Sequence, residues 1–307
     1  MNLFSLFADL ERVDPEMYGR FDSRRRVFRH FGTAGKAVTG AVLPGLLSGL
    51  FQKAYGQTGL SGDIIAVLNL ALSLEYLESY YYQAALSANI LSADDKAAFT
   101  TIQQDEQGHI AALRTTLGSA AIADPTPAAF DFTAGGRVSP APTASLASFL
   151  AIAQAFEDLG VRAYKGSLAT LLPSKDVLKM ALGIHSVEAR HASHVRTLRR
   201  GGVGVAGADG GGPNDSLPKS WVSLRENNGP LPALTTAIYA AGTTVDSPAE
   251  DNLVQVKLNV QTNSDPPGAN LRFPAASEAF DEPLDAARVK AIALNFVAAG
   301  NPKGIFM

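Results

Sequence analysis

Residues 75–109 read EYLESYYYQAALSANILSADDKAAFTTIQQDEQGH, and residues 157–191 read EDLGVRAYKGSLATLLPSKDVLKMALGIHSVEARH. Each stretch begins with a glutamate and ends with a Glu-x-x-His motif. The repeated residues are Glu75, Glu106 and His109 in the first stretch and Glu157, Glu188 and His191 in the second. Each residue of the second triplet follows its counterpart by 82 positions, so the chain repeats one set of acidic and imidazole side chains.

The spacing within each triplet predicts helices that converge on one point. Residues three apart on an α-helix project from the same face, so each Glu-x-x-His motif can offer a carboxylate oxygen and an imidazole nitrogen together. The single glutamates lie in apolar runs, LNLALSLEYL for Glu75 and FLAIAQAFEDLG for Glu157. Because an ionised carboxylate is costly to bury without a partner, we expect a cation beside them.

The composition of the repeated set favours two metal ions. Its four carboxylates carry four negative charges, which two divalent cations would cancel. Carboxylates and neutral imidazoles suit iron or manganese, and the chain has no cysteine to favour zinc or copper(I). We therefore expect two iron or two manganese ions per chain. The alternative of six solvated side chains on polar helix faces fits poorly with their apolar neighbours.

The six residues, with the strings LSLEYLE, DEQGH, AFEDLG and VEARH, resemble the ferritin-like superfamily. The resemblance covers residues 62–200 and is closest to bacterial ferritin-like-domain or desiccation-related proteins, with bacterioferritin and manganese catalase more distant. The closing string EAFDEPLDAARVKAIALNFV is also similar to the end of that bacterial group. The resemblance implies an all-α core, a ferritin-like four-helix bundle with an internal two-fold repeat and a long crossover.

Four helices are predicted within residues 61–200. Their expected bounds are about 63–86, about 93–117 after an N-cap at Ser92, from a cap at Thr143 or Ser145 to near Pro173, and from Ser174 to about 199. The Pro-, Gly- and Ala-rich residues 118–143 must then form the crossover between the two helix pairs.

Further residues are candidates for supporting the metal ligands. Tyr82 and Tyr164 match at the same offset, seven residues after each single glutamate, and are expected to bond a ligand, to act as redox-active phenols, or simply to fill the core. Asp105 is expected to hold a histidine of the opposing helix in one tautomer. Val187 takes the matching place in the other half, so the two metal environments should differ.

Three other residues near the set are weaker candidates. Glu78 could compete with Glu75 as a ligand, but its counterpart at the 82-residue offset is Gly160, so the repeat favours Glu75. His185 and His194 lie three residues from Glu188 and His191 respectively, but helical drift carries them off the line of the ligands.

The whole-chain composition sets outer bounds. The chain has 307 residues, of which 46% are hydrophobic, enough for one large or two modest domains. A net charge of -3, from 26 basic and 29 acidic residues, makes nucleic-acid binding an unlikely role. The absence of cysteine excludes disulfides, iron–sulfur clusters and thiol catalysis, but leaves the redox compartment open.

Residues 1–60 are expected to form an N-terminal segment with an apolar helix. The string Ser23-Arg24-Arg25-Arg26-Val27-Phe28-Arg29 resembles a twin-arginine export motif and precedes an apolar, Gly-rich stretch. The sequence departs from that pattern in three ways. About twenty residues precede the arginines, Lys36 interrupts the apolar run, and no clear cleavage site follows. We expect a periplasmic or cell-envelope location, with a cytoplasmic location and a basic patch before a packing helix as the alternative.

Residues 201–307 are predicted to be a Gly-rich linker followed by an irregular C-terminal extension that wraps the bundle or mediates assembly. The extension contains an apolar string, LPALTTAIYAAG, and a period-two run from Val254 to Val260 that predicts a strand. A last helix is expected over about 284–298.

The resemblance implies ferrous iron oxidation, peroxide dismutation with manganese, or O2-dependent oxidation of an organic substrate. Twofold repetition without an obvious substrate pocket favours small oxidants or ferrous iron, so we expect a ferroxidase-like or manganese-catalase-like homo-oligomer that acts in oxidative or desiccation stress. The alternative is a structural or assembly protein of the cell envelope, with a vestigial or purely stabilising metal.

Overall fold

The computed structural model of the protein describes residues 59–202, 218–255, 258–259, 277–301 and 303–306. Four long helices make up its centre: α4 (Gly62–Ser87), α5 (Ala93–Leu117), α6 (Leu146–Leu171) and α7 (Lys175–Arg199). The prediction of an all-α bundle is confirmed, and the helix bounds lie within a few residues of those expected. The predictions for residues 1–58 and for most of the Gly-rich stretch lie outside the described residues.

Serine side chains begin three of the four helices. The first N–H groups of a helix lack partners within it, and a serine hydroxyl can accept a hydrogen bond from one of them. Ser92 accepts from the backbone N–H of Asp95 at 3.1 Å, and Ser145 accepts from that of Ser148 at 3.2 Å. Ser61 does the same at the start of α4. Ser145, rather than Thr143, is therefore the cap of α6.

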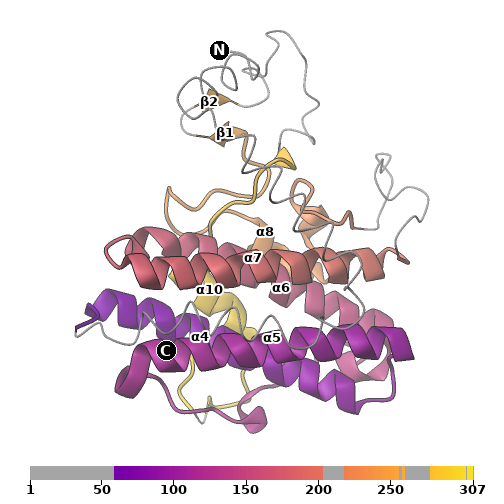
Figure 1. Ribbon diagram of the computed structural model, residues 1–307. Coiled ribbons are helices and arrows are strands. Elements are labelled where there is room, and N and C mark those ends of the chain that lie inside the picture. The colour runs from indigo at the N-terminus through magenta and orange to yellow at the C-terminus, as the bar shows by residue number, and fades with distance from the viewer. Residues whose placement is uncertain (1–58, 203–217, 256–257, 260–276, 302, 307) are drawn as a thin grey trace, which may run out of the picture.

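The bundle consists of two helical hairpins. Short connections at 88–92 and 172–174 join α4 to α5 and α6 to α7, and α4 also packs against α6. Figure 1 shows α4 and α5 in one layer and α6 and α7 in the other. The long crossover between the hairpins contains three short 3-10 turns, η2 (Gly118–Ala120), η3 (Pro127–Ala129) and η4 (Pro142–Ala144). No helix in the described part of the chain is long and apolar enough to cross a membrane.

The C-terminal part of the chain contributes to the same hydrophobic core as the bundle. Helix α8 (Pro232–Tyr239) packs on α6, and α10 (Ala286–Ala293) packs on α4 and α6. Phe296 is 2% exposed and makes an edge-on ring contact with Phe156 of α6, at 4.8 Å between centroids. The described part of the extension therefore packs directly on the bundle.

The last helix is shorter than predicted. Asp285 caps it by accepting from the backbone N–H of Arg288 at 3.0 Å, and the helix tightens into the 3-10 turn η6 (Leu294–Phe296). Val297 is extended and forms a β-bridge with Phe130 of the crossover. This bridge ends the helix and ties the C-terminal region to the connection between the hairpins.

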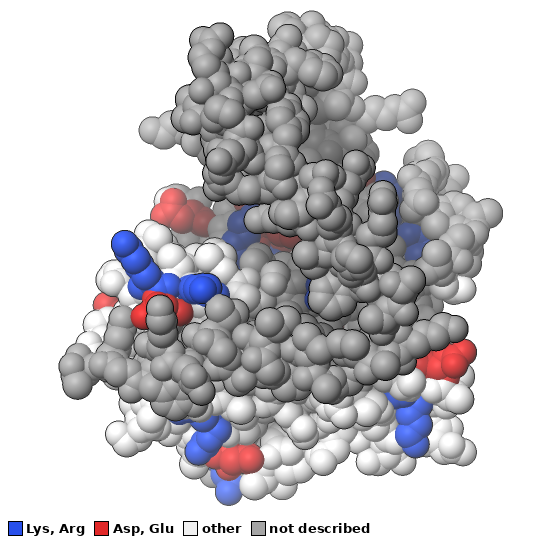
Figure 2. Space-filling model, viewed as in Figure 1, with Lys and Arg blue, Asp and Glu red and all other residues white. Residues whose placement is uncertain are grey.

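The period-two run does not form one extended strand. It forms two short antiparallel strands, β1 (Val254–Gln255) and β2 (Leu258–Asn259), in which Val254 pairs with Asn259. The partner that a lone strand needs is thus the second half of the same run. Around the bundle, the face shown in Figure 2 carries acidic and basic side chains interspersed among its described residues, in keeping with the small net charge.

One buried arginine holds the C-terminal segments against α6. Arg162 is 2% exposed and forms an ion pair with Glu250 at 2.8 Å. Its guanidinium also donates to the backbone carbonyls of Ile238, Ala240, Pro248, Glu282 and Pro283. One turn further along, Gly166 lies so close to Leu284 that an added Cβ would be 2.0 Å from the Leu284 carbonyl oxygen. The charged side chain of Arg162 and the lack of a side chain at Gly166 therefore allow the extension to pack closely on the bundle.

Replacing Arg162 tests how the extension is attached. Arg162→Met should lower the free energy of unfolding by about 3–5 kcal/mol, the usual loss when one partner of a buried ion pair is removed. Urea denaturation followed by circular dichroism measures this change. Arg190→Met, at an exposed position of α7, is the control and should stay within about 0.5 kcal/mol of the wild type. Equal stability of both variants would mean that apolar packing alone holds the extension.

Candidate metal centre

All four bundle helices contribute to a cluster of acidic and imidazole side chains inside the core. The cluster comprises Glu75 from α4, Glu106 and His109 from α5, Glu157 from α6, and Glu188 and His191 from α7. The four glutamates are 0% exposed, His109 is 1% exposed and His191 is 6% exposed. The structure thus brings together all six residues that the repeat singles out.

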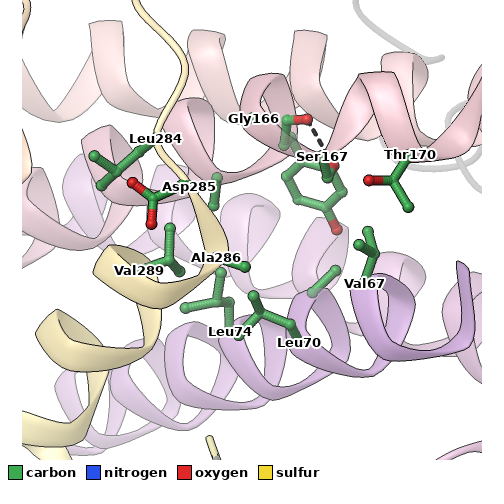
Figure 3. Close-up of a pocket in the computed structure, with 13 residues that line it drawn as sticks. Val67, Leu70, Leu74, Gly166, Ser167, Thr170, Leu284, Asp285, Ala286 and Val289 are labelled. Atoms are coloured by element: carbon green, nitrogen blue, oxygen red, sulfur yellow. Dashed lines mark hydrogen bonds between the residues drawn. The ribbon is translucent and has the colours of Figure 1, made fainter. Parts of the chain in front are cut away.

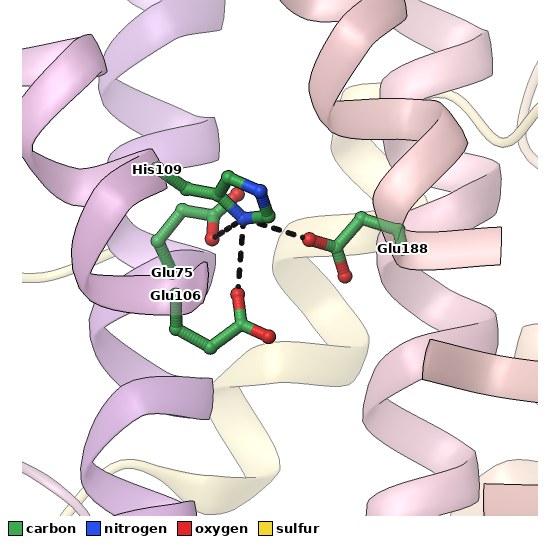
Figure 4. Close-up of side chains that lie close together, drawn as sticks. All are labelled: Glu75, Glu106, His109 and Glu188. Atoms are coloured by element: carbon green, nitrogen blue, oxygen red, sulfur yellow. Dashed lines mark hydrogen bonds and ion pairs between the residues drawn. The ribbon is translucent and has the colours of Figure 1, made fainter. Parts of the chain in front are cut away.

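The first half of the centre surrounds His109. Its Nδ1 atom lies 3.1 Å from Glu75 Oε2, 3.1 Å from Glu106 Oε2 and 3.0 Å from Glu188 Oε1 (Figure 4). A single imidazole N–H cannot satisfy three carboxylates at once. These four residues can each offer one ligand atom, all within 4.8 Å of one another, to a single metal ion.

The second half has the same plan around His191. Its Nδ1 atom lies 3.0 Å from Glu106 Oε1 and 3.6 Å from Glu157 Oε2. Glu106, Glu157, Glu188 and His191 form a second group whose ligand atoms lie within 4.8 Å of one another. Because Glu106 and Glu188 belong to both groups, the arrangement can place two ions side by side with two shared carboxylates.

Several atoms of the centre have no hydrogen-bond partner among the described residues. They are Oε1 of Glu106, Oε2 of Glu157, both carboxylate oxygens of Glu188 and Nδ1 of His191. Some of these atoms are close to one another, but the contacts lack hydrogen-bond geometry. Buried polar atoms are normally satisfied, and unpaired buried carboxylates are particularly costly. The donor set therefore fits metal ions better than it fits a closed network of hydrogen bonds.

The pKa values of the carboxylates shift in opposite directions. Burial raises the pKa of Glu75 to about 8, although His109 acts against the shift, and burial also raises that of Glu157 well above its usual range. Burial alone would raise the pKa of Glu106 as well, but the contacts with His191 and His109 hold it below its usual range. Glu75 and Glu157 thus differ from Glu106 in how readily they hold a proton, and cations would relieve the repulsion among the carboxylates.

Two buried tyrosines connect the halves of the repeat. The Tyr82 hydroxyl donates to Oε1 of Glu157, and the Tyr164 hydroxyl donates to Oε1 of Glu75. Each tyrosine therefore orients the single glutamate of the other half, not the glutamate that precedes it on its own helix. Their side chains are 0% and 4% exposed, so the bonds are shielded from water.

The two histidines differ in the hydrogen-bond partner of the Nε2 atom, the ring nitrogen that faces away from the centre. His191 Nε2 is 3.3 Å from Oδ2 of Asp105, a contact that fixes the ring orientation and leaves Nδ1 facing the centre. His109 Nε2 is buried and has no hydrogen-bond partner among the described residues. The residue that matches Asp105 in the repeat is Val187, whose side chain cannot accept a hydrogen bond. The repeat therefore gives two similar ligand sets with unequal support.

His185 and His194 belong to neither group of ligand atoms. Burial lowers the pKa of both side chains, which favours their neutral forms. His194 instead packs edge-on against the ring of Phe99.

Glu78 also lies close to the cluster, although the comparison of the two repeats favoured Glu75 over it. It lies one turn after Glu75, is 2% exposed, and approaches the cluster beside α6. At Gly160 an added Cβ would be 3.3 Å from Glu78 Oε1 and 3.2 Å from Glu188 Oε2. The glycine that argued against Glu78 as the repeated ligand is the residue that makes room for it.

A sequence model of the ferritin-like domain family matches residues 63–200, which include the four helices and all six clustered side chains. Residues 63–200 are a ferritin-like domain. No curated protein and no solved structure matches the chain. The family match thus covers the bundle and its buried cluster. The C-terminal extension lies outside the matched residues.

Removing the carboxylate behind His191 tests the unequal support. Asp105→Val copies the residue found at the matching position. With Co2+ as a divalent test ion titrated into the metal-free protein, the variant should weaken one of the two binding steps by about tenfold or more, the usual effect of losing such a partner. Isothermal titration calorimetry resolves the steps. Gln104→Val, at the exposed neighbouring position, controls for a β-branched residue in α5. A loss of the same size in both binding steps would contradict a role confined to His191.

Proposed function

We propose that the ferritin-like domain binds a pair of iron or manganese ions and uses them in redox chemistry with O2, peroxide or ferrous iron, in protection against oxidative or desiccation stress. The observation that supports this proposal is the pair of ligand groups that share Glu106 and Glu188 while each has its own histidine. Ligand groups that share carboxylates place two ions close enough to act together.

Each side chain has a definite part in this proposal. Glu106 and Glu188 would be shared by the two positions, His109 and His191 would each hold one ion, and Glu75 and Glu157 would complete the two ligand sets. When bound, the metal pair supplies the exchange of electrons with a small oxidant. Tyr82 and Tyr164 hold the outer glutamates in place through their hydroxyl groups.

The surroundings of the centre favour a small reactant. All six ligands are nearly or fully buried, so a large organic molecule could reach them only by displacing the residues that cover them. A cavity of about 160 Å³ lies between α4, α6 and the start of α10, with apolar walls that include Val67, Leu70 and Val289 (Figure 3). Tyr164 also lines this cavity, and its hydroxyl touches Glu75, so a small molecule can come close to the ligands there.

Metal content and matched variants test the proposal. Elemental analysis of the purified protein should give about two iron or manganese ions per chain, as the charge of four carboxylates requires. Glu75→Gln removes a ligand of one group and should lower the content towards one ion, whereas Glu106→Gln removes a shared ligand and should lower it further. Both variants should slow peroxide dismutation or ferrous oxidation by at least about tenfold.

Circular dichroism must show that both variants keep the helical content of the wild type. Wild-type protein that contains no metal, takes none up and oxidises neither substrate would contradict the proposal. Such a result would favour the alternative of a structural or assembly protein of the cell envelope. Homo-oligomerisation and an envelope location stay predictions from the sequence, and size-exclusion chromatography and cell fractionation test them.

A further inference from the structure

Glu78 is a fifth carboxylate at the edge of the metal centre, in addition to the four of the repeated set. It follows Glu75 by one helical turn on α4 and is 2% exposed. A long acidic side chain buried in this way needs a counter-charge or a proton.

Gly160 is what allows Glu78 to approach. A Cβ at this position would lie 3.3 Å from Glu78 Oε1 and 3.2 Å from Glu188 Oε2, closer than nearly all such contacts. Because Gly160 is in a helix and has no positive φ, backbone conformation does not require a glycine there. The space serves two carboxylates, one of which is a proposed bridging ligand.

No lysine or arginine of the described residues forms an ion pair with Glu78. The buried arginine on α7, Arg196, is already paired with Asp158 at 2.5 Å and with Glu226 at 2.9 Å. Burial raises the pKa of Glu78 well above its usual range, and repulsion from Glu188, the strongest from any carboxylate, adds to the shift.

We propose that Glu78 is a fifth carboxylate of the metal centre and that its charge favours a trivalent ion at one of the two positions. This inference rests on the proposed function, because it requires that the centre binds metal. Four carboxylates balance two divalent ions, whereas five balance one divalent and one trivalent ion. The attraction between a carboxylate and an ion is proportional to the charge of the ion, so Glu78 stabilises a trivalent ion more than a divalent one.

The binding of two redox-inactive ions tests this inference without an assay of activity. Ga3+ serves as the trivalent probe and Zn2+ as the divalent probe, and each is titrated from a buffered complex into metal-free wild type, Glu78→Gln and Glu75→Gln. Glu78→Gln keeps the shape of the side chain and removes its charge. It should weaken Ga3+ binding by at least about tenfold, or about 1.4 kcal/mol, and Zn2+ binding by less than about threefold.

Two further variants make the result specific. Glu75→Gln, one turn earlier on the same helix, removes a direct ligand and should weaken both ions strongly. Glu78→Leu places an apolar side chain at this buried position and should also weaken Ga3+ more than Zn2+. If Glu78→Gln does not fold, as judged by circular dichroism and thermal unfolding, Glu78→Leu provides the comparison.

The possible outcomes separate this inference from the proposed function. Wild-type protein that binds both ions, with Glu78→Gln and Glu78→Leu either unchanged or weakened equally for the two ions, overturns the inference and leaves the proposed function intact. Wild-type protein that binds neither ion overturns both. A selective loss of Ga3+ binding in the Glu78 variant supports the inference.

Discussion

Mutual repulsion among buried carboxylates is the constraint on which this structure depends. The helices of both hairpins carry glutamates into one region of the core, where water cannot screen them. Leu72, Phe149 and Ile184 are fully buried on three of these helices, and such apolar burial contributes the stabilisation that opposes the repulsion. Close packing of the four helices therefore requires that protons or cations neutralise the centre.

The internal repeat supplies ligands in pairs, but the contacts cross between its halves. Both ligand groups include Glu106 from the first half and Glu188 from the second, and each tyrosine bonds the glutamate of the opposite half. A single helical hairpin therefore has only part of a site. The two halves of the repeat differ at two positions near the centre. Asp105 in the first half matches Val187 in the second, and Glu78 matches Gly160, so the two metal positions have unequal surroundings.

The bundle and its buried cluster could be predicted from the sequence because both follow from local spacing. Glu-x-x-His places two side chains on one helix face, and serines next to apolar runs indicate where α5 and α6 begin. The environment of Glu78 could not be predicted in this way, because it depends on how closely α4 and α6 pack. The short β1–β2 pair was missed for a related reason: alternation of apolar residues predicts extended chain but does not show where the chain reverses.

Helix α6 connects the centre to the C-terminal extension through two of its faces. Glu157 and Tyr164, seven residues apart, lie on the face towards the other bundle helices. Arg162 and Gly166, four residues apart, lie on the face that the extension covers. A bare bundle would leave Arg162 and the apolar wall beside Tyr164 open to water. Electrostatic interactions weaken where water enters, because water raises the local dielectric constant. By excluding water, the extension strengthens both the attraction of the ligands for a cation and the repulsion between their carboxylates.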